Sequence, residues 1–206
     1  MQTAPRTPKE PPEPSDWPVR LRVRPALDVS EDQFFEICQY SEILWIERSA
    51  EGAWQIMLST GPIVSMRNVN ITWQLGNWAQ QDGTGVGFGS STGFRLPNTA
   101  VRAPDAGWLP KARLASLSAD EWEKFPPLCP DFVLELWSPS DRLSDLQAKM
   151  DEYLQNGAQL GWLLYPPERC VYVYRPGAAV ERLDNHTKVS GNPVLRGFEL
   201  DLTQVW

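Results

Sequence analysis

The chain has 206 residues, of which 42% are hydrophobic and ten are tryptophan, enough for one domain with a sizeable buried core. The 19 basic and 26 acidic residues give a formal charge of −7, which disfavours indiscriminate binding to a phosphate backbone. No segment has the length and apolar character of a membrane span, and the start lacks the pattern of a signal peptide. We therefore expect a cytoplasmic protein with no membrane partner.

The scarcity of cysteine and histidine restricts the chemistry. Cys38, Cys129 and Cys170 are odd in number and far apart, which argues against a disulfide framework. No C-x-x-C pair accompanies His186, the single histidine, so a Cys/His zinc site is disfavoured. His186 lies in a polar stretch typical of a turn, which also disfavours Ser-His-Asp and Cys-His catalysis.

The first residues differ in composition from the rest. Residues 1–20 are rich in proline, which favours an extended, disordered lead. Residues 21–206 show no internal repeat and no second composition shift, and we expect them to form a single domain.

Helical and alternating patterns then follow one another. Apolar spacing predicts a helix over 30–41, with Ser30 as its N-cap, and a second helix over 66–81. Between them, residues 42–60 alternate around Glu-Gly and predict a two-stranded hairpin, with Glu47 late in its first strand.

A glycine-rich segment comes next. Glycines at every second position predict a hairpin over 82–98 whose glycine face another backbone or a ligand approaches closely. A dinucleotide-binding or P-loop reading lacks the required flanking elements. Residues 101–110 predict a short strand containing Asp105, and Ser118 with Glu121 predicts a capped short helix.

The segment "CPDFVLELWSPSD" predicts a buried strand that carries two acids, Asp131 and Glu135. A buried carboxylate is costly unless it is paired, hydrogen-bonded or bound to a cation. Four residues along a strand span roughly 13 Å, too far for the two acids to share one ion. We expect Asp131 to accept hydrogen bonds at the start of the strand, and Glu135 to be the functional candidate.

The clearest helix is predicted over 141–157, ended by Asn-Gly. Lys149 lies four residues after Asp145, so it either forms a surface ion pair with it or leans toward the end of the preceding strand. We expect Asp145 and Glu152 to form a solvated face. Further strands are predicted over 160–167 and 169–177, as a hairpin, with one more in the tail over 192–206.

Several motifs over residues 30–206 together resemble one family. "RAPDAGW", "PDFVLELWSPSD", "LQAKMDEYLQNGAQLGWLL", "VYVYRPG" and "VLRGFELDL" are similar to segments of the Uma family of restriction-endonuclease-like proteins, in the PD-(D/E)xK nuclease superfamily. The resemblance implies a mixed α/β fold with a restriction-endonuclease-like core, in which a bent mixed sheet is flanked by helices.

The resemblance also implies a site. Asp105 and Glu135 match the two acids that bind Mg²⁺ or Mn²⁺, but Trp137 stands where the superfamily motif has its lysine. Lys149 on the following helix matches the place to which this family moves the basic residue. Glu47 matches a supporting acid, although it could instead be a surface acid paired with Arg48 or another base.

The implied function is metal-dependent hydrolysis of DNA, and a homodimer fits a fold that often pairs to address two strands. The rival hypothesis is a nuclease fold kept as a non-catalytic binding or assembly module. The charge of −7, the missing adjacent lysine and the high tryptophan content favour that rival. The tryptophans themselves are expected to fill core and interface rather than to stack on bases.

Overall fold

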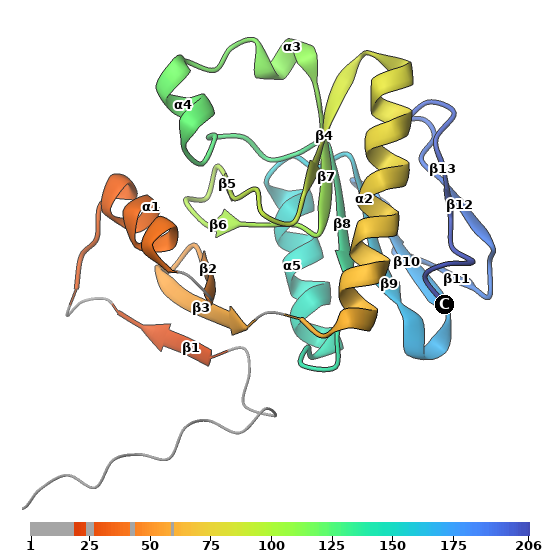
Figure 1. Cartoon of the computed structure of the whole chain (residues 1–206), viewed down its shortest axis with the longest axis horizontal. Coiled ribbons are helices and arrows are strands. Elements are labelled where there is room, and N and C mark those ends of the chain that lie inside the picture. The colour runs from red at the N-terminus through yellow and green to blue at the C-terminus, as the bar shows by residue number, and fades with distance from the viewer. Residues whose placement is uncertain (1–18, 24–26, 42–43, 59) are drawn as a thin grey trace, which may run out of the picture.

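The computed structural model describes residues 19–23, 27–41, 44–58 and 60–206 (Figure 1). The predicted lead over residues 1–20 lies outside the described residues, except for its last two, which begin strand β1 (Val19–Arg22). Within the described part of the chain, no helix is long and apolar enough to cross a membrane. The assignment of residues 21–206 to one domain stays a prediction.

A six-stranded sheet forms the centre of the fold, in the order β11-β10-β9-β8-β7-β4. Its strands are β4 (Gly85–Gly89), β7 (Ala106–Pro110), β8 (Phe132–Leu136), β9 (Leu160–Tyr165), β10 (Cys170–Tyr174) and β11 (Glu181–Asp184). Strands β8 and β9 run parallel, and the other neighbours run antiparallel. The predicted mixed α/β class is confirmed.

Helices cover both faces of this sheet (Figure 1). Helix α5 (Leu143–Gln155) connects β8 to β9, as a parallel pair requires, and packs Met150 and Tyr153 on one face. Helix α2 (Pro62–Asp82) packs on the other face, beside the small sheet of β12 (Lys188–Ser190) and β13 (Glu199–Asp201). Alternate residues of β8 therefore enter two different hydrophobic cores.

A second sheet lies beside the first, in the order β1-β3-β2-β6-β5. Its other strands are β2 (Leu44–Arg48), β3 (Ala53–Leu58), β5 (Phe94–Arg95) and β6 (Val101–Arg102). Helix α1 (Glu31–Tyr40) packs on one face, where the Phe34 ring lies 5.5 Å from the Trp54 ring. The opposite face of β1, β3 and β2 is left for the cleft described below.

The N-terminal predictions agree closely with these elements. Helix α1 begins after a capping box made by Ser30 and Gln33, and β2 pairs with β3 as the predicted hairpin, with Glu47 in β2. Helix α2 begins at Pro62, four residues before the predicted start, because proline suits the first turn of a helix.

The predicted glycine hairpin is wrong. Strand β4 pairs with β7 in the six-stranded sheet, and β5 pairs with β6 in the other sheet. The expected close approach of another backbone is not found at Gly87, where a Cβ would make only ordinary contact with α2, 3.6 Å from the Cα of Gly76. The tight neighbours of these glycines are side chains: a Cβ on Gly85 would collide with the Trp108 ring, and one on Gly89 would lie 3.3 Å from Thr72 Cγ2 in α2.

The predicted strand over 101–110 is two strands, β6 and β7, which belong to different sheets. Pro104 lies between them and has no N–H to donate to a ladder, so the strand is interrupted there. Asp105 lies in this connection, directly before β7.

The connection from β7 to β8 holds two short helices, α3 (Lys111–Leu114) and α4 (Ala119–Glu123). The capping box of Ser118 and Glu121 is confirmed at α4, whereas α3 was not predicted. The hairpin of β9 and β10 is confirmed around a short 3₁₀ turn, η2 (Pro166–Glu168), and β13 is the predicted tail strand. The polar strands β11 and β12 were not predicted.

Candidate active site

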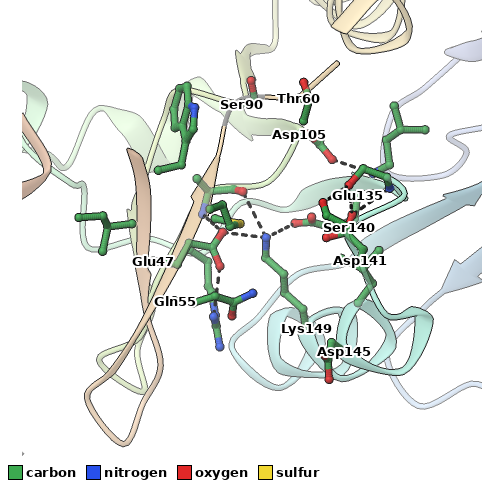
Figure 2. Close-up of a pocket in the computed structure, with 18 of the residues that line it drawn as sticks. Glu47, Gln55, Thr60, Ser90, Asp105, Glu135, Ser140, Asp141, Asp145 and Lys149 are labelled. Atoms are coloured by element: carbon green, nitrogen blue, oxygen red, sulfur yellow. Dashed lines mark hydrogen bonds and ion pairs between the residues drawn. The ribbon is translucent and has the colours of Figure 1, made fainter. Parts of the chain in front are cut away.

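The four candidate residues Glu47, Asp105, Glu135 and Lys149 line one cleft of about 2080 Å³. One wall is the free face of β1, β3 and β2, and another is helix α2. The inner end is formed by the ends of β8 and α5, so the four side chains arrive from separate elements. Figure 2 shows Lys149 extending from α5 between Glu47 and Glu135, with Asp105 beyond Glu135.

Lys149 is the centre of this arrangement. Its Nζ lies 2.8 Å from Glu47 Oε1 and 2.9 Å from Glu135 Oε1, and it donates to the carbonyl of Ala103 at 3.3 Å. These three acceptors match the three N–H groups of an ammonium. Burial alone would lower the pKa of Lys149, but Glu135 and Glu47 outweigh it and raise that pKa, so the side chain stays cationic. Of the two predicted alternatives, Lys149 takes the one toward the strand end.

Glu47 is held by cations on both carboxylate oxygens. Its Oε1 accepts from Lys149 and from the N–H of Ala103 at 3.0 Å, and its Oε2 lies 3.2 Å from Arg102. Burial favours a higher pKa for Glu47, yet Lys149 and Arg102 together lower it. Arg48, the next residue, points to the opposite face of β2 and pairs with Glu31. The alternative of a surface Glu47 paired with Arg48 or another base is therefore wrong as to the surface and Arg48, since Glu47 is buried and its partners are Lys149 and Arg102.

Glu135 lies on the α5 face of β8 and is 4% exposed. Its Oε1 receives a hydrogen bond of 3.1 Å from the Tyr153 hydroxyl besides the contact with Lys149. Burial raises the pKa of Glu135 to about 8, and the nearby carboxylates of Asp105 and Glu47 act in the same direction, against Lys149. Near neutral pH this carboxylate therefore lacks enough positive charge around it.

Asp105 is held by neutral donors. The N–H of Leu136 donates to its Oδ2 at 2.7 Å, and the Asn68 amide donates to its Oδ1 at 2.9 Å. Burial raises the pKa of Asp105 despite these bonds. Asn68 Oδ1 is buried next to Asp105 and has no hydrogen-bond partner among the described residues. Asn68 Oδ1 is thus an oxygen acceptor without a described partner, and it lies beside the Asp105 carboxylate, which forms no ion pair with a described cation.

A second group of charged residues surrounds Glu47. Arg102 also bonds Glu152 at 2.6 Å, and Asn98 donates to the same carboxylate at 2.9 Å. The expectation that Glu152 belongs to a solvated face is wrong, because its side chain is 16% exposed and bound to Arg102. Glu152 follows Lys149 by three residues, so helical spacing already placed it on the same side of α5. Nothing in the sequence pointed to Arg102 or Asn68.

Asp131 and Trp137 flank the two ends of β8, and Asp145 lies on α5. Asp131 accepts a hydrogen bond from Arg113 and forms an ion pair with it at the start of the strand. Its expected role as a structural acceptor is therefore confirmed. Trp137, at the motif's lysine position, donates from Nε1 to the carbonyl of Asp141 at 3.0 Å. Its indole thus ties down the loop after β8. Asp145 pairs with Arg20 rather than with Lys149, at 2.8 Å.

The donor set fits a hard divalent cation. When all are ionised, four carboxylates face only two cationic side chains here: Glu47, Asp105, Glu135 and Glu152 against Arg102 and Lys149. Mg²⁺ is usually held by one or two carboxylates and completes its shell with water and phosphate oxygens. Asp105 and Glu135 supply such a pair, and the unpaired Asn68 Oδ1 is a further oxygen donor. No group of three or more acidic, His or Cys side chains able to hold a metal occurs in the described ranges.

The fold and the family of the chain both have known relatives. The chain is similar to a solved structure titled "a putative nuclease belonging to DUF820 from Anabaena variabilis", with a TM-score of 0.66 and 19% identity, over 82% of this chain and 91% of that one. At this identity the likeness establishes the fold. Residues 32–203 match the Uma2 family, described as "Putative restriction endonuclease". The chain therefore belongs to this family, which confirms the resemblance found in its motifs. No curated protein matched the sequence.

Proposed function

We propose that this protein is an endonuclease that hydrolyses DNA phosphodiester bonds with the help of Mg²⁺ or Mn²⁺. The observation that carries the proposal is the contact of 2.9 Å between Lys149 Nζ and Glu135. Although Trp137 replaces the lysine of the strand motif, α5 brings an ammonium group to the same acid. The family and the fold of the chain support the same class of reaction.

Asp105 and Glu135 would hold the cation, with Asn68 Oδ1 as a further oxygen donor. A divalent cation bound there supplies Lewis acidity, which lowers the pKa of a water molecule and offsets charge on the phosphate. Leu136 N–H and the Asn68 amide fix the orientation of Asp105, and the Tyr153 hydroxyl does the same for Glu135. Such outer hydrogen bonds set the direction of ligand oxygens.

Lys149 would orient the attacking water and stabilise negative charge on the phosphate oxygens. All three of its N–H groups have acceptors in the structure, so it must give up one bond to act on a substrate. The bond to Glu135 is the one to release, because the charge of Glu135 is then met by the cation it binds. Glu47 and Ala103 keep the ammonium in place meanwhile.

Glu47 acts through Lys149 in this scheme and is a positioning residue. Its carboxylate is shared between Lys149 and Arg102, and Arg102 is in turn fixed by Glu152. This chain of ion pairs holds Lys149 charged and aimed into the cleft. The same residues give Glu47 little capacity left for a metal ion.

The test is cleavage of plasmid and oligonucleotide DNA with Mg²⁺, Mn²⁺ or EDTA. We expect metal-dependent cleavage by the natural chain and at least a roughly hundredfold loss in Glu135→Ala and Lys149→Met. The matched controls are Glu199→Ala and Lys188→Met, at an exposed ion pair outside the cleft. Cleavage that persists in both site variants would contradict the proposal.

The rival non-catalytic module gives a different set of results. It predicts a folded protein that cuts no DNA and takes up no Mn²⁺ in calorimetric titration near neutral pH. A homodimer and a cytoplasmic location stay predictions, and light scattering coupled to size exclusion measures the first of them.

A further inference from the structure

The cleft carries two features that the hydrolysis of a phosphodiester does not need. Two tryptophans, Trp45 on β2 and Trp73 on α2, line it with 43% and 66% of their surface exposed. Trp45 shares a strand face with Glu47, since they are two residues apart on β2, and Met57 pairs opposite Trp45 on β3. Exposed apolar side chains gathered around a site mark a surface that binds something.

The basic side chains of the cleft are the second feature. Five basic residues line it, Arg20, Arg22, Arg102, Arg142 and Lys149, beside six acidic ones, so the cleft has no net positive charge when all are ionised. Arg20, Arg102 and Lys149 are already paired with carboxylates. Among the described residues, only the exposed Arg22 and Arg142 have no carboxylate partner in that cleft.

The two basic side chains without a carboxylate partner in the described part of the cleft, Arg22 and Arg142, are few for the binding of a duplex. Proteins that hold double-stranded DNA place many Lys and Arg side chains on the phosphates of both strands, and these contacts supply much of the affinity. Proteins that hold single strands instead combine cations along the backbone with aromatic rings on which unpaired bases stack, and the stacking itself contributes affinity for each base. The two exposed indoles fit the stacking part of this pattern, and Arg22 and Arg142 are the cations near them without a carboxylate partner among the described residues.

We propose that the cleft binds an unpaired nucleic-acid strand, whose bases stack on Trp45 and Trp73 and whose phosphates contact Arg22 and Arg142. This inference rests on the proposed nuclease function and names the substrate class for it. Trp45 and Glu47 lie on the same face of β2. When a base stacks on Trp45, the sugar-phosphate backbone of its nucleotide is therefore directed toward the carboxylates of the site. The bond cut then belongs to a single-stranded or locally unpaired segment. The expectation that the tryptophans pack in the core and at interfaces does not extend to Trp45 and Trp73 in this proposal.

Binding is measured first, in EDTA, so that metal-dependent cleavage does not interfere. Fluorescence anisotropy follows a labelled single-stranded DNA, the matching RNA and a blunt DNA duplex of the same sequence. We expect the single-stranded DNA to bind at least about tenfold more tightly than the duplex. The RNA arm distinguishes a requirement for deoxyribose from stacking alone: equal affinity means that stacking is sufficient.

Trp45→Ala and Trp73→Ala should each weaken single-strand binding at least about fivefold, and Trp45→Phe should recover part of it. The matched control is Trp122→Ala, at a tryptophan on α4 that is 52% exposed but outside the cleft. Circular dichroism and thermal unfolding check that each variant is folded. The inference is overturned by a duplex that binds as tightly as the single strand, or by Trp45 and Trp73 variants that bind like Trp122→Ala.

A separate cleavage assay with Mn²⁺ separates this inference from the proposed function. Preferred cleavage of the duplex would overturn the inference and leave the nuclease proposal in place. Tryptophan-dependent binding of single strands without any cleavage would contradict the nuclease proposal and leave the ligand class standing. A third outcome is that single strands do not bind and that Trp73→Ala abolishes concentration-dependent self-association. Trp73 then belongs to an interface between two copies of the chain, and the inference fails.

Discussion

Two sides of the candidate site hold their carboxylates in opposite ways. On the cation side, Glu47 meets Lys149 and Arg102. On the acceptor side, Leu136 N–H and Asn68 are the hydrogen-bond donors to Asp105 among the described residues, and Glu135 shares Lys149 with Glu47. Positive charge lowers the pKa of Glu47, whereas burial raises the pKa of both Asp105 and Glu135.

The difference separates two roles for the same chemical group. A carboxylate that is already neutralised on both oxygens supports its neighbours, while one that is buried without enough positive charge favours a proton or a metal ion. The cation side therefore positions Lys149, and the acceptor side is the place for a cation. Substitutions that remove one side at a time distinguish these two roles.

The largest effect on the free energy of unfolding is expected from Lys149→Met. This substitution removes a cation that the cation side and the acceptor side share. Glu47 and Glu135 would be left buried with less compensation, and breaking a buried pair in this way costs about 3–5 kcal/mol. Urea unfolding of the variant and of the natural chain measures the difference in the free energy of unfolding. Lys188→Met, at an exposed pair, is the control and should leave that free energy unchanged.

The second prediction concerns pH and Glu135. Its folded pKa of about 8 exceeds the ordinary value of 4.5, so its contribution to stability is complete below pH 4.5 and is lost as pH rises through about 8. In EDTA the slope can reach at most about 1.4 kcal/mol per pH unit. Glu47 has the opposite shift and acts at lower pH, outside this window.

Glu135→Gln should flatten the loss of stability between pH 5 and 8, because an amide resembles the protonated acid and does not titrate. Thermal unfolding at a series of pH values gives both curves. Parallel curves for the variant and the natural chain would show that Glu135 is already ionised across that range.

The third prediction compares Mn²⁺ affinity on the two sides. Asp105→Asn removes a proposed ligand and should weaken binding by at least about a hundredfold, whereas Glu47→Gln should weaken it by about tenfold or less, since Glu47 acts through Lys149. Isothermal titration calorimetry near pH 8 measures both. Equal losses would place Glu47 among the ligands.

The smallest effect is expected at the mouth of the cleft. Arg20 on β1 pairs with Asp145 on α5 at 2.8 Å, but the arginine side chain is 56% exposed. Exposed pairs contribute about 0–1 kcal/mol. Arg20→Gln should therefore change the free energy of unfolding by less than about 1 kcal/mol. Urea unfolding of this variant and of Lys149→Met, measured in parallel, compares the two effects.

The sequence predicted the parts of this site that depend on local periodicity. Strand alternation placed Glu135 on a covered face, and helical spacing left Lys149 a route to the strand end. The pairing of β4 with β7 was not predictable in this way, because the turn after β4 could have closed a simple hairpin with β5, whereas β5 pairs with the next strand, β6. The partners of Glu47 were missed for the same reason: Arg102 lies 55 positions away in the chain.

Pro104 marks a break in the strand expected over residues 101–110. Proline restricts itself and the residue before it, so "RAPD" should have divided the predicted strand into two. Asp105 would then have been placed in a connection from the start. Its role as a metal ligand stays a prediction, because a turn aspartate and a ligand aspartate look alike in sequence.

That short connection between β6 and β7 has a mechanical consequence. Ala103 bonds Glu47 through its N–H and Lys149 through its carbonyl, and two residues later Asp105 bonds the N–H of Leu136 at the end of β8. This direct passage from the N-terminal sheet to the central sheet is therefore also part of the wall of the site. Any tilt of one sheet against the other changes the spacing between the Lys149 ammonium and the Glu47 and Glu135 carboxylates, so a ligand that moves either sheet would alter this site without touching these side chains.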